Sequence, residues 1–247
     1  MTIGYLAVLL AGAAAGGFIN GLAGFGTALL ALGFWLQIMA PERAVAIVVV
    51  MSVLSGLQGL WIVREAIADN PARLMRFLVP ALPGVFLGVG LLARLDATVL
   101  KIVVGMFCLL YGGFFIARRS LPVFSRTTPV GDSVIGFAGG VLGGAASLSG
   151  VLPTMWCALR PWPKAEQRAV LQPFNVAVLG LTVIVLAWNG LYDRTTLIHI
   201  AIALPITLLA AQAGIAVFQR LTDSAFRRLL IVLLFVSGVV ILARELF

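Results

Sequence analysis

The sequence is poor in charge, in cysteine and in catalytic motifs. Charged residues make up only 11% of the chain, against about a quarter in an ordinary soluble domain. The two cysteines, Cys108 and Cys157, both lie in apolar stretches, which argues against a disulfide or a thiolate metal framework. No Ser-His-Asp, HExxH, P-loop or CxxC pattern occurs. We therefore expect neither an enzyme nor a protein with a cofactor or bound metal.

Acidic residues are scarcer than basic ones, with 9 Asp and Glu against 17 Lys and Arg. The resulting formal net charge of +8 could indicate nucleic-acid binding. The basic residues form no continuous stripe, however, and lie in short clusters between apolar segments, which is the pattern that orients a membrane protein. We expect a lipid bilayer and no nucleic acid as the partner.

What the chain does contain is apolar sequence. Hydrophobic residues make up 62% of it, and the mean hydropathy is +1.12. This composition predicts an all-α polytopic membrane protein without a separate soluble domain. The N-terminus lacks a charged n-region and a clear cleavage site, so we expect the first apolar segment to belong to the mature protein.

A glycine-rich stretch at 16–33 interrupts the first apolar run, which covers about 3–39. Five glycines fall between Gly16 and Gly26, with Asn20 and Thr27 beside them. Glycine weakens a helix and permits backbone conformations that other residues avoid. In lipid, a broken helix is tolerated only where protein or a watery cavity meets its free backbone groups. The stretch therefore predicts either a hinge that lines a cavity or close packing of helices through small residues.

The pattern restarts in the second half with another glycine-rich stretch at 133–159. Residues correspond at an offset of 123 to 126, so that Gly21 falls on Gly144 and Pro80 on Pro205. This ordered series predicts an internal duplication into repeats 1–125 and 126–247. We expect each repeat to hold one hairpin and three transmembrane helices. The first repeat has hairpin 3–39 and spans at about 43–63, 74–94 and 97–117; the second has hairpin 133–159 and spans at about 166–188, 196–219 and 225–244.

Charge distribution favours hairpins that enter and leave on the same side. If both glycine-rich stretches return to the side from which they enter, the Lys and Arg count is 12 on one side and 5 on the other. If each stretch crosses once, the count is 8 against 9. The positive-inside rule then predicts two re-entrant hairpins, inverted repeats and periplasmic termini. Two complete but short crossings per stretch would give the same count and stay open as an alternative.

The lengths agree with half-crossings. We expect each arm of the first hairpin to hold roughly 13–16 residues, or about 20–24 Å, whereas the hydrocarbon core is about 30 Å thick. The glycine tips of the two hairpins should then meet near the membrane centre.

Helix N-termini at these tips offer free N–H groups and partial positive charge, which suits a small anion. The expected substrate-binding residues are Asn20, Gly24, Phe25, Gly26, Thr27, Ser147, Ser149, Gly150, Gln172 and Asn175. The alternative is that the hydroxyls bond their own helices and the amides bridge neighbouring helices.

Four further residues are expected to line or gate the pathway: Arg43, Arg168, Ser52 and Gln58. The two arginines begin equivalent spans and should lie near opposite faces, where they would attract anions or simply satisfy loop carbonyls. No acidic residue falls deep in an expected span. Proton coupling would therefore use a rim group such as Glu42 or Glu166, or else the protein is a uniporter.

The glycine-rich openings of both halves and the paired Arg43-Ala44-Val45 and Arg168-Ala169-Val170 resemble the sulfite exporter TauE/SafE family, also called the toluene sulfonate uptake permeases. The resemblance covers essentially the whole chain. It implies a bacterial inner-membrane carrier for sulfite, thiosulfate, sulfoacetate or other small sulfonates. Phe25 stands where many members have a small residue, which should narrow the pocket. Cys108 and Cys157 do not match the pathway cysteines of thiosulfate importers, so we do not expect a thiosulfate relay.

The expectation is thus an exporter of small sulfur-containing anions, such as sulfite, sulfoacetate or isethionate, that works by alternating access. Two alternatives stay open, namely a carrier of small carboxylates and a membrane assembly protein without transport activity. The sequence is also compatible with a homodimer.

Overall fold

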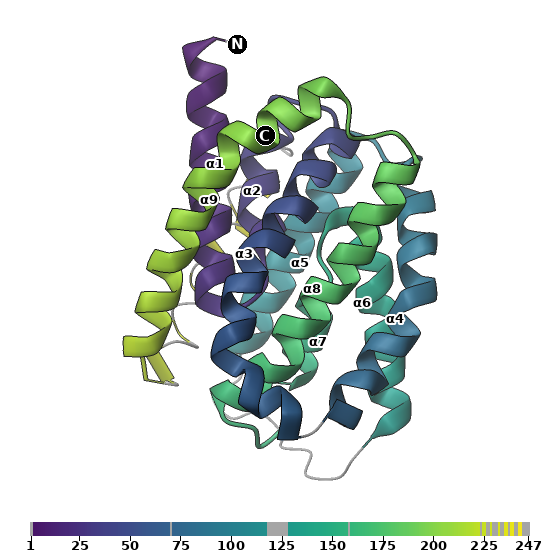
Figure 1. The fold of residues 1–247 in the computed structure, drawn as a ribbon, viewed down its shortest axis with the longest axis vertical. Coiled ribbons are helices and arrows are strands. Elements are labelled where there is room, and N and C mark those ends of the chain that lie inside the picture. Colours follow the sequence, from purple (N-terminus) through teal and green to yellow (C-terminus); the bar gives the residue numbers. More distant parts are fainter. Residues whose placement is uncertain are drawn as a thin grey trace.

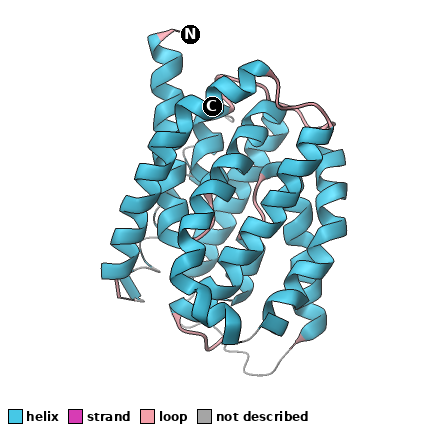
Figure 2. Cartoon of the chain, viewed as in Figure 1, coloured by secondary structure: helices cyan, strands magenta, loops and turns pink. Residues whose placement is uncertain are grey.

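The computed structural model describes residues 2–69, 71–117, 128–157 and 159–222, together with isolated positions beyond residue 222. All regular structure in this part of the chain is helical, as expected (Figure 2). The expected span at 225–244 lies largely outside the described residues. The helices are α1 Ile3–Ala23, α2 Thr27–Trp35, α3 Pro41–Asp69, α4 Pro71–Leu92, α5 Ala97–Ala117, α6 Pro129–Ala146, α7 Val151–Cys157, α8 Lys164–Trp188 and α9 Arg194–Arg220.

Two long antiparallel helices, α3 and α8, occupy the middle of the view in Figure 1. Gly56 of α3 lies against Gln172 and Val176 of α8. Beyond the other end of α8, the Tyr192 hydroxyl donates a hydrogen bond to the Ala46 carbonyl over 3.2 Å. The helices α1 and α9 lie on one side of this pair, and α4 and α6 on the other.

The first hairpin consists of α1 and α2, which pack antiparallel. Trp35 at the end of α2 lies against Gly12 and donates a 3.0 Å hydrogen bond to the Leu9 carbonyl. The chain reverses at Gly24 and Gly26, whose φ angles of 82° and 93° are easily reached only by glycine. This break alone separates the helices, and the earlier glycines remain helical.

The arms of the first hairpin are unequal, so the expectation of 13–16 residues for each arm was wrong. The helix α1 has 21 residues and α2 has 9. The glycines at 17 and 21 do not end α1 because they serve as packing surface, where a Cβ would overlap the carbonyl oxygens of Thr207 and Ala211 in α9. The glycine cluster thus combines both interpretations, close packing along α1 and a break at its end.

The second hairpin consists of α6 and α7. Trp156 of α7 donates a 2.8 Å hydrogen bond to Asp132 near the start of α6, while Gly139 farther along α6 lies against Ser149. These contacts set the two helices antiparallel. Ser147 ends α6 with a φ of 57°, a left-handed conformation that is uncommon for a residue other than glycine.

Each hairpin packs against a long helix from the other half of the chain. Gly17 and Gly21 of α1 meet Thr207 and Ala211 of α9, and Gly140 and Gly144 of α6 meet Ala81 and Val85 of α4. The two sets correspond at the offsets found in the sequence, 123 for the glycines (140 − 17) and 126 for their partners (207 − 81).

The two hairpins run in opposite directions. The helix α1 is parallel to α3, because Tyr5 lies near Arg43 and Asn20 lies near Ser52. The helix α6 is parallel to α8, because Gly139 and Gly143 lie against Phe174 and Val178. Since α3 and α8 are antiparallel, α1 and α6 must also point in opposite directions.

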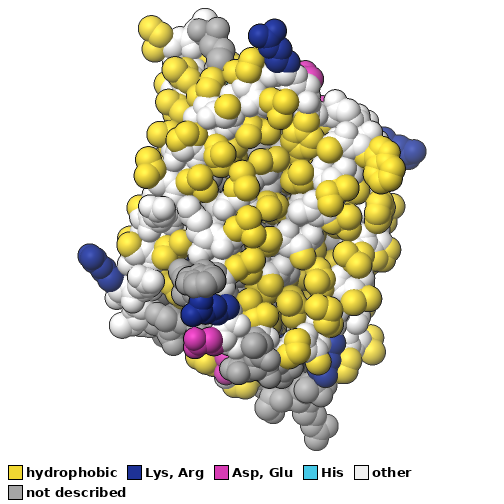
Figure 3. Space-filling view, in the orientation of Figure 1, with side chains coloured by type: hydrophobic (Ala, Val, Ile, Leu, Met, Phe, Trp, Pro, Cys, Tyr) yellow, Lys and Arg dark blue, Asp and Glu magenta, His cyan; other side chains and the backbone are white. Residues whose placement is uncertain are grey.

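The outer surface suits a bilayer. Five helices of the described chain, α1, α3, α4, α8 and α9, are long and apolar enough to cross a membrane. On the face in Figure 3, hydrophobic side chains cover the middle, and Lys, Arg, Asp and Glu lie towards the ends. The helix α4 exposes Val79, Phe86 and Leu87. Large apolar side chains so exposed are typical of contact with lipid, and the chain is a multi-pass membrane protein.

Candidate functional site

The loops that join the two helices of each hairpin touch each other. We call residues 24–26 the first tip and residues 147–150 the second tip. Phe25 is 2% exposed, and a Cβ built on Gly150 would lie 2.6 Å from the Phe25 Cβ. Gly24 lies beside the side chains of Gln172 and Arg168 in α8. The junction of the tips therefore lies in the protein interior, next to α8.

Arg168 reaches the end of α1 from α8. Its Nη2 donates to the Gly21 carbonyl over 2.9 Å, and its Nη1 donates to the Leu22 carbonyl over 3.3 Å. The last carbonyls of a helix lack intrahelical partners and carry partial negative charge, so a cation is favourable there. The guanidinium also lies 4.3 Å from the ring centroid of Phe218, a cation–π contact.

No carboxylate of the described residues forms an ion pair with Arg168, although only 3% of this residue is exposed. Moving a charged group from water into the protein interior costs on the order of several kcal/mol unless nearby partners offset the lost hydration. Here the offset comes from two backbone carbonyls, one ring face and Gln172 Oε1, which accepts from Nε over 3.3 Å. The site thus holds a buried positive charge that could also attract an anion.

One face of α8 continues this polar lining. Arg168, Gln172 and Asn175 follow at the i, i+4 and i+7 spacing that aligns side chains on one side of a helix. Gln172 donates a 2.8 Å hydrogen bond to the Gly56 carbonyl of α3. Asn175 Oδ1 accepts a hydrogen bond from the Ser149 hydroxyl at the second tip. The same helix therefore contacts both tips.

Asn20 connects the first hairpin to α3. Its Nδ2 donates to the Ser52 carbonyl over 3.1 Å and also to the Ser55 hydroxyl. Ser55 in turn donates to the Met51 carbonyl. These contacts match the alternative in which the amide bridges helices, but they leave Asn20 Oδ1 without a partner.

Several expected site residues bury a polar atom that has no hydrogen-bond partner in the described structure. Buried polar atoms are nearly always satisfied, so each exception marks an atom to which a ligand or water can bind. The helix α2 adds an N-terminus with Gly26 as its N-cap and no side-chain cap. The atoms are Asn20 Oδ1, Thr27 Oγ1, Ser52 Oγ, Gln58 Oε1, Ser147 Oγ and Asn175 Nδ2.

The two arginines do not occupy equivalent places. Arg43 forms a 3.1 Å ion pair with Asp193 and is partly exposed, at the end of the molecule that holds the start of α1. Hydrogen bonds from the Thr196 backbone and side chain, with Arg43 nearby, lower the pKa of Asp193. Arg168, in the first turns of the antiparallel α8, lies towards the other end of the molecule, but it is buried at the first tip because the long α1 reaches those turns of α8.

No sequence pattern pointed to Phe218, which lies far along the chain from Arg168. A buried ion network at the open end of the second hairpin was also missed. There Asp132 is 3.3 Å from Arg160 and 4.0 Å from Arg76. An acid at the start of one arm and an arginine just after the other arm could have indicated this pairing.

Comparisons with known proteins identify the family of the chain. Residues 8–241 match the model of a family described as sulfite exporter TauE/SafE. The chain is similar to a protein of Cupriavidus necator named probable sulfite/organosulfonate exporter TauE. The two are 26% identical over 212 residues, which cover 81% of this chain and 79% of that protein. The chain belongs to the sulfite exporter TauE/SafE family.

Proposed function

We propose that the protein exports small sulfur oxyanions or organosulfonates across the bacterial inner membrane, and that the anion binds where the two tips meet. The observation that carries this proposal is Arg168, a buried cation beside the first tip with no carboxylate partner among the described residues. An anion at the junction would balance this charge and reach the polar atoms around it.

Helix dipoles strengthen the argument. At the first tip the C-terminus of α1, with partial negative charge, lies next to the N-terminus of α2, with partial positive charge. Taken alone, these two ends would largely cancel. Because Arg168 binds the α1 carbonyls, the negative end is neutralised and the free N–H groups of α2 are left to attract an anion.

The architecture that we propose is a pair of inverted repeats, each with a hairpin that re-enters the membrane. Its support is the opposite direction of α1 and α6 and the matched packing of each hairpin against a helix from the other half. Inverted-repeat transporters bind their substrates near the midplane, between the repeats. The repeat boundaries near residue 125 fall outside the described residues.

The two ends of the molecule suggest how access alternates. With the more basic side in the cytoplasm, the start of α1 faces the periplasm. At the cytoplasmic end, Asp132 pairs with Arg160 across the open end of the second hairpin and with Arg76 of α4, while Glu166 of α8 pairs with Arg73 of α4. Phe25 closes the junction itself by filling the space against Gly150. Transport would require Phe25 to move and the cytoplasmic ion pairs to open in turn.

The substrate class is supported by the family and by the name of the Cupriavidus necator relative. A sulfonate or sulfite offers three oxygens around one sulfur, which suits converging N–H and O–H donors. A planar carboxylate offers two oxygens and should use fewer of these donors. Carboxylate transport at rates equal to sulfonate transport would favour the alternative carrier.

Flux into proteoliposomes tests the proposal. Vesicles with the wild-type protein should accumulate labelled sulfite or sulfoacetate, and Arg168→Gln should lower the rate at least tenfold, as expected for one lost charged hydrogen bond of about 1.5–3 kcal/mol. Thr182→Val is the matched control, because the Thr182 hydroxyl is buried on the same helix and, among the described residues, bonds only the Val178 carbonyl. Equal flux in folded Arg168→Gln and wild-type protein would overturn the proposal.

A further inference from the structure

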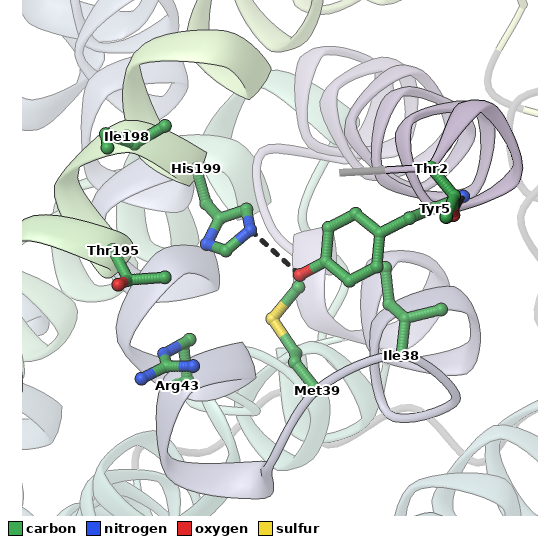
Figure 4. A pocket seen from close by; sticks show the side chains of 8 residues that line it. All are labelled: Thr2, Tyr5, Ile38, Met39, Arg43, Thr195, Ile198 and His199. Carbon is green, nitrogen blue, oxygen red and sulfur yellow. Dashed lines mark hydrogen bonds between the residues drawn. The ribbon is translucent and has the colours of Figure 1, made fainter.

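A cleft with several polar side chains in its lining lies at the periplasmic end, far from the tips. It has a volume of about 550 Å³ and lies between the first turns of α1, α3 and α9 (Figure 4). Tyr5, which lines it, is nineteen residues before Gly24, or about 28 Å along the helix. The cleft is therefore separate from the junction of the tips, and its volume is in the range of small-molecule sites.

His199 is the only histidine in the sequence, and it lines this cleft with just 5% of its surface exposed. Its Nε2 is 2.8 Å from the Tyr5 hydroxyl. A phenol is a stronger donor than a neutral imidazole, so we assign the shared proton to Tyr5 and the ring hydrogen of His199 to Nδ1. The Thr195 carbonyl lies near the ring, but Nδ1 forms no hydrogen bond with any residue that the structure describes.

Arg43 supplies positive charge to the same cleft. One of its N–H groups binds Asp193 over 3.1 Å, and this is the one hydrogen bond that Arg43 makes to the described residues. An arginine has five N–H groups, so four remain for another acceptor. Figure 4 shows the Arg43 guanidinium and a ring nitrogen of His199 on the same side of the cleft, next to Thr195.

We propose that this cleft is a second anion site, where Arg43 and His199 Nδ1 bind the oxyanion group of a small solute or of a lipid headgroup. The proposal does not depend on the junction of the tips or on the direction of transport. A buried N–H donor lies beside a guanidinium that has N–H groups left for another acceptor. This pair fits an oxyanion, since oxyanions bind most strongly to charged and pre-oriented donors. A cationic ligand would be repelled by Arg43, and a neutral ligand would form weaker hydrogen bonds with its guanidinium than an oxyanion does.

The single histidine allows a direct test that needs no transport assay. Protein labelled with ¹⁵N-histidine and purified without a histidine tag should give the ring signals of His199 alone. We expect sodium sulfite, at constant ionic strength, to shift the Nδ1 resonance in a saturable way. Nanodiscs of phosphatidylcholine, with and without phosphatidylglycerol, distinguish a free anion from a headgroup phosphate. A shift with either source supports the site and identifies the source.

Variants then separate this site from the first. Arg43→Gln should weaken the response at least tenfold, and Tyr5→Phe should weaken it because Nε2 loses the partner that orients the ring. Asp193→Asn, which keeps an N-cap side chain, should strengthen it by releasing Arg43. Arg168→Gln should leave it unchanged. A His199 signal that responds to neither anion source, or that responds equally in Arg43→Gln, would overturn the second site without affecting the proposed transport.

Discussion

Phe25 of the first tip lies directly against Gly150 of the second tip. A Cβ on Gly150 would lie 2.6 Å from the Phe25 Cβ and 2.8 Å from its Cγ, which are atoms close to the backbone and cannot swing away. This contact joins the two halves of the chain at the place where we propose the substrate binds. It makes the size of the two side chains a sensitive probe of the junction.

Gly150→Ala should therefore push the tips apart, at a cost of about 1–3 kcal/mol, the usual penalty for overpacking. The loss in the double variant with Phe25→Ala should be smaller than the sum of the two single losses, because the ring contacts at 2.8 and 3.0 Å disappear although the Cβ contact at 2.6 Å remains. We expect thermal unfolding in detergent to show this non-additivity. Strictly additive losses for the two single variants would show that the residues do not touch.

Helix packing through glycine provides a second test, because the two halves use matching positions. In Gly21→Ala the new Cβ would overlap the Ala211 carbonyl oxygen, and in Gly144→Ala it would overlap the Val85 carbonyl oxygen. Both variants should lower stability by similar amounts, about 1–3 kcal/mol. Gly180→Ala is the control, since nothing lies within 4 Å of its Cβ position and alanine favours a helix by about 1 kcal/mol.

Stability measurements with a folding reporter check this pair. If Gly21→Ala and Gly144→Ala were as stable as Gly180→Ala, the tight contacts of α1 with α9 and of α4 with α6 would be wrong. If only one were tolerated, the two hairpins would not be packed alike.

Two buried threonines should respond in opposite ways to the same change. Thr27 Oγ1 has no partner within the described structure, whereas Thr182 Oγ1 donates to the Val178 carbonyl over 2.9 Å. Thr27→Val should keep or raise stability, by up to about 1 kcal/mol, yet weaken sulfonate binding several-fold. Thr182→Val should lower stability by about 1 kcal/mol and leave binding unchanged.

Parallel measurements of melting temperature and of sulfoacetate affinity distinguish the two roles. The account is contradicted if Thr27→Val loses stability while its affinity stays at the wild-type value, because the hydroxyl would then be structural.

Ion pairs at the two ends should differ in strength. Asp132 and Arg160 are both buried, so Asp132→Asn should cost about 3–5 kcal/mol by leaving a buried cation without this carboxylate. Asp193 and Arg43 are much more exposed, and Asp193→Asn should change stability little because solvent screens the pair. A chemical unfolding series on both variants checks the order, and equal losses would contradict it.

Sequence patterns predicted some of this structure and missed other parts for identifiable reasons. The all-α class followed from the apolar composition, because hydropathy identifies membrane helices. The family followed from the glycine-rich openings of the two halves. The depth of Arg168 did not follow, since it depends on how far α1 extends before Gly24 breaks it. Glycines that pack and glycines that break a helix look alike in sequence, and only the φ angles of Gly24 and Gly26 separate them.

Site residues show the same division. Polar residues in apolar runs indicated Asn175 and Gln172, whose contacts now connect α8 to the second tip and to α3. The partners themselves could not be predicted, because Ser149 lies in the second hairpin and Gly56 in α3, both far from α8 in the sequence. The pairing of Tyr5 with His199 joins residues 194 positions apart, for which a single sequence carries no signal.

The most direct test of the central claim is to locate a heavy anion in the protein. Selenite has the shape and charge of sulfite, and its selenium can be located by anomalous scattering from crystals of the complex. The account predicts a selenium peak at the junction of the tips, within reach of Arg168, Thr27 and Ser147, and loss of that peak in Arg168→Gln. A junction without selenium, in crystals of protein that transports selenite, would contradict it.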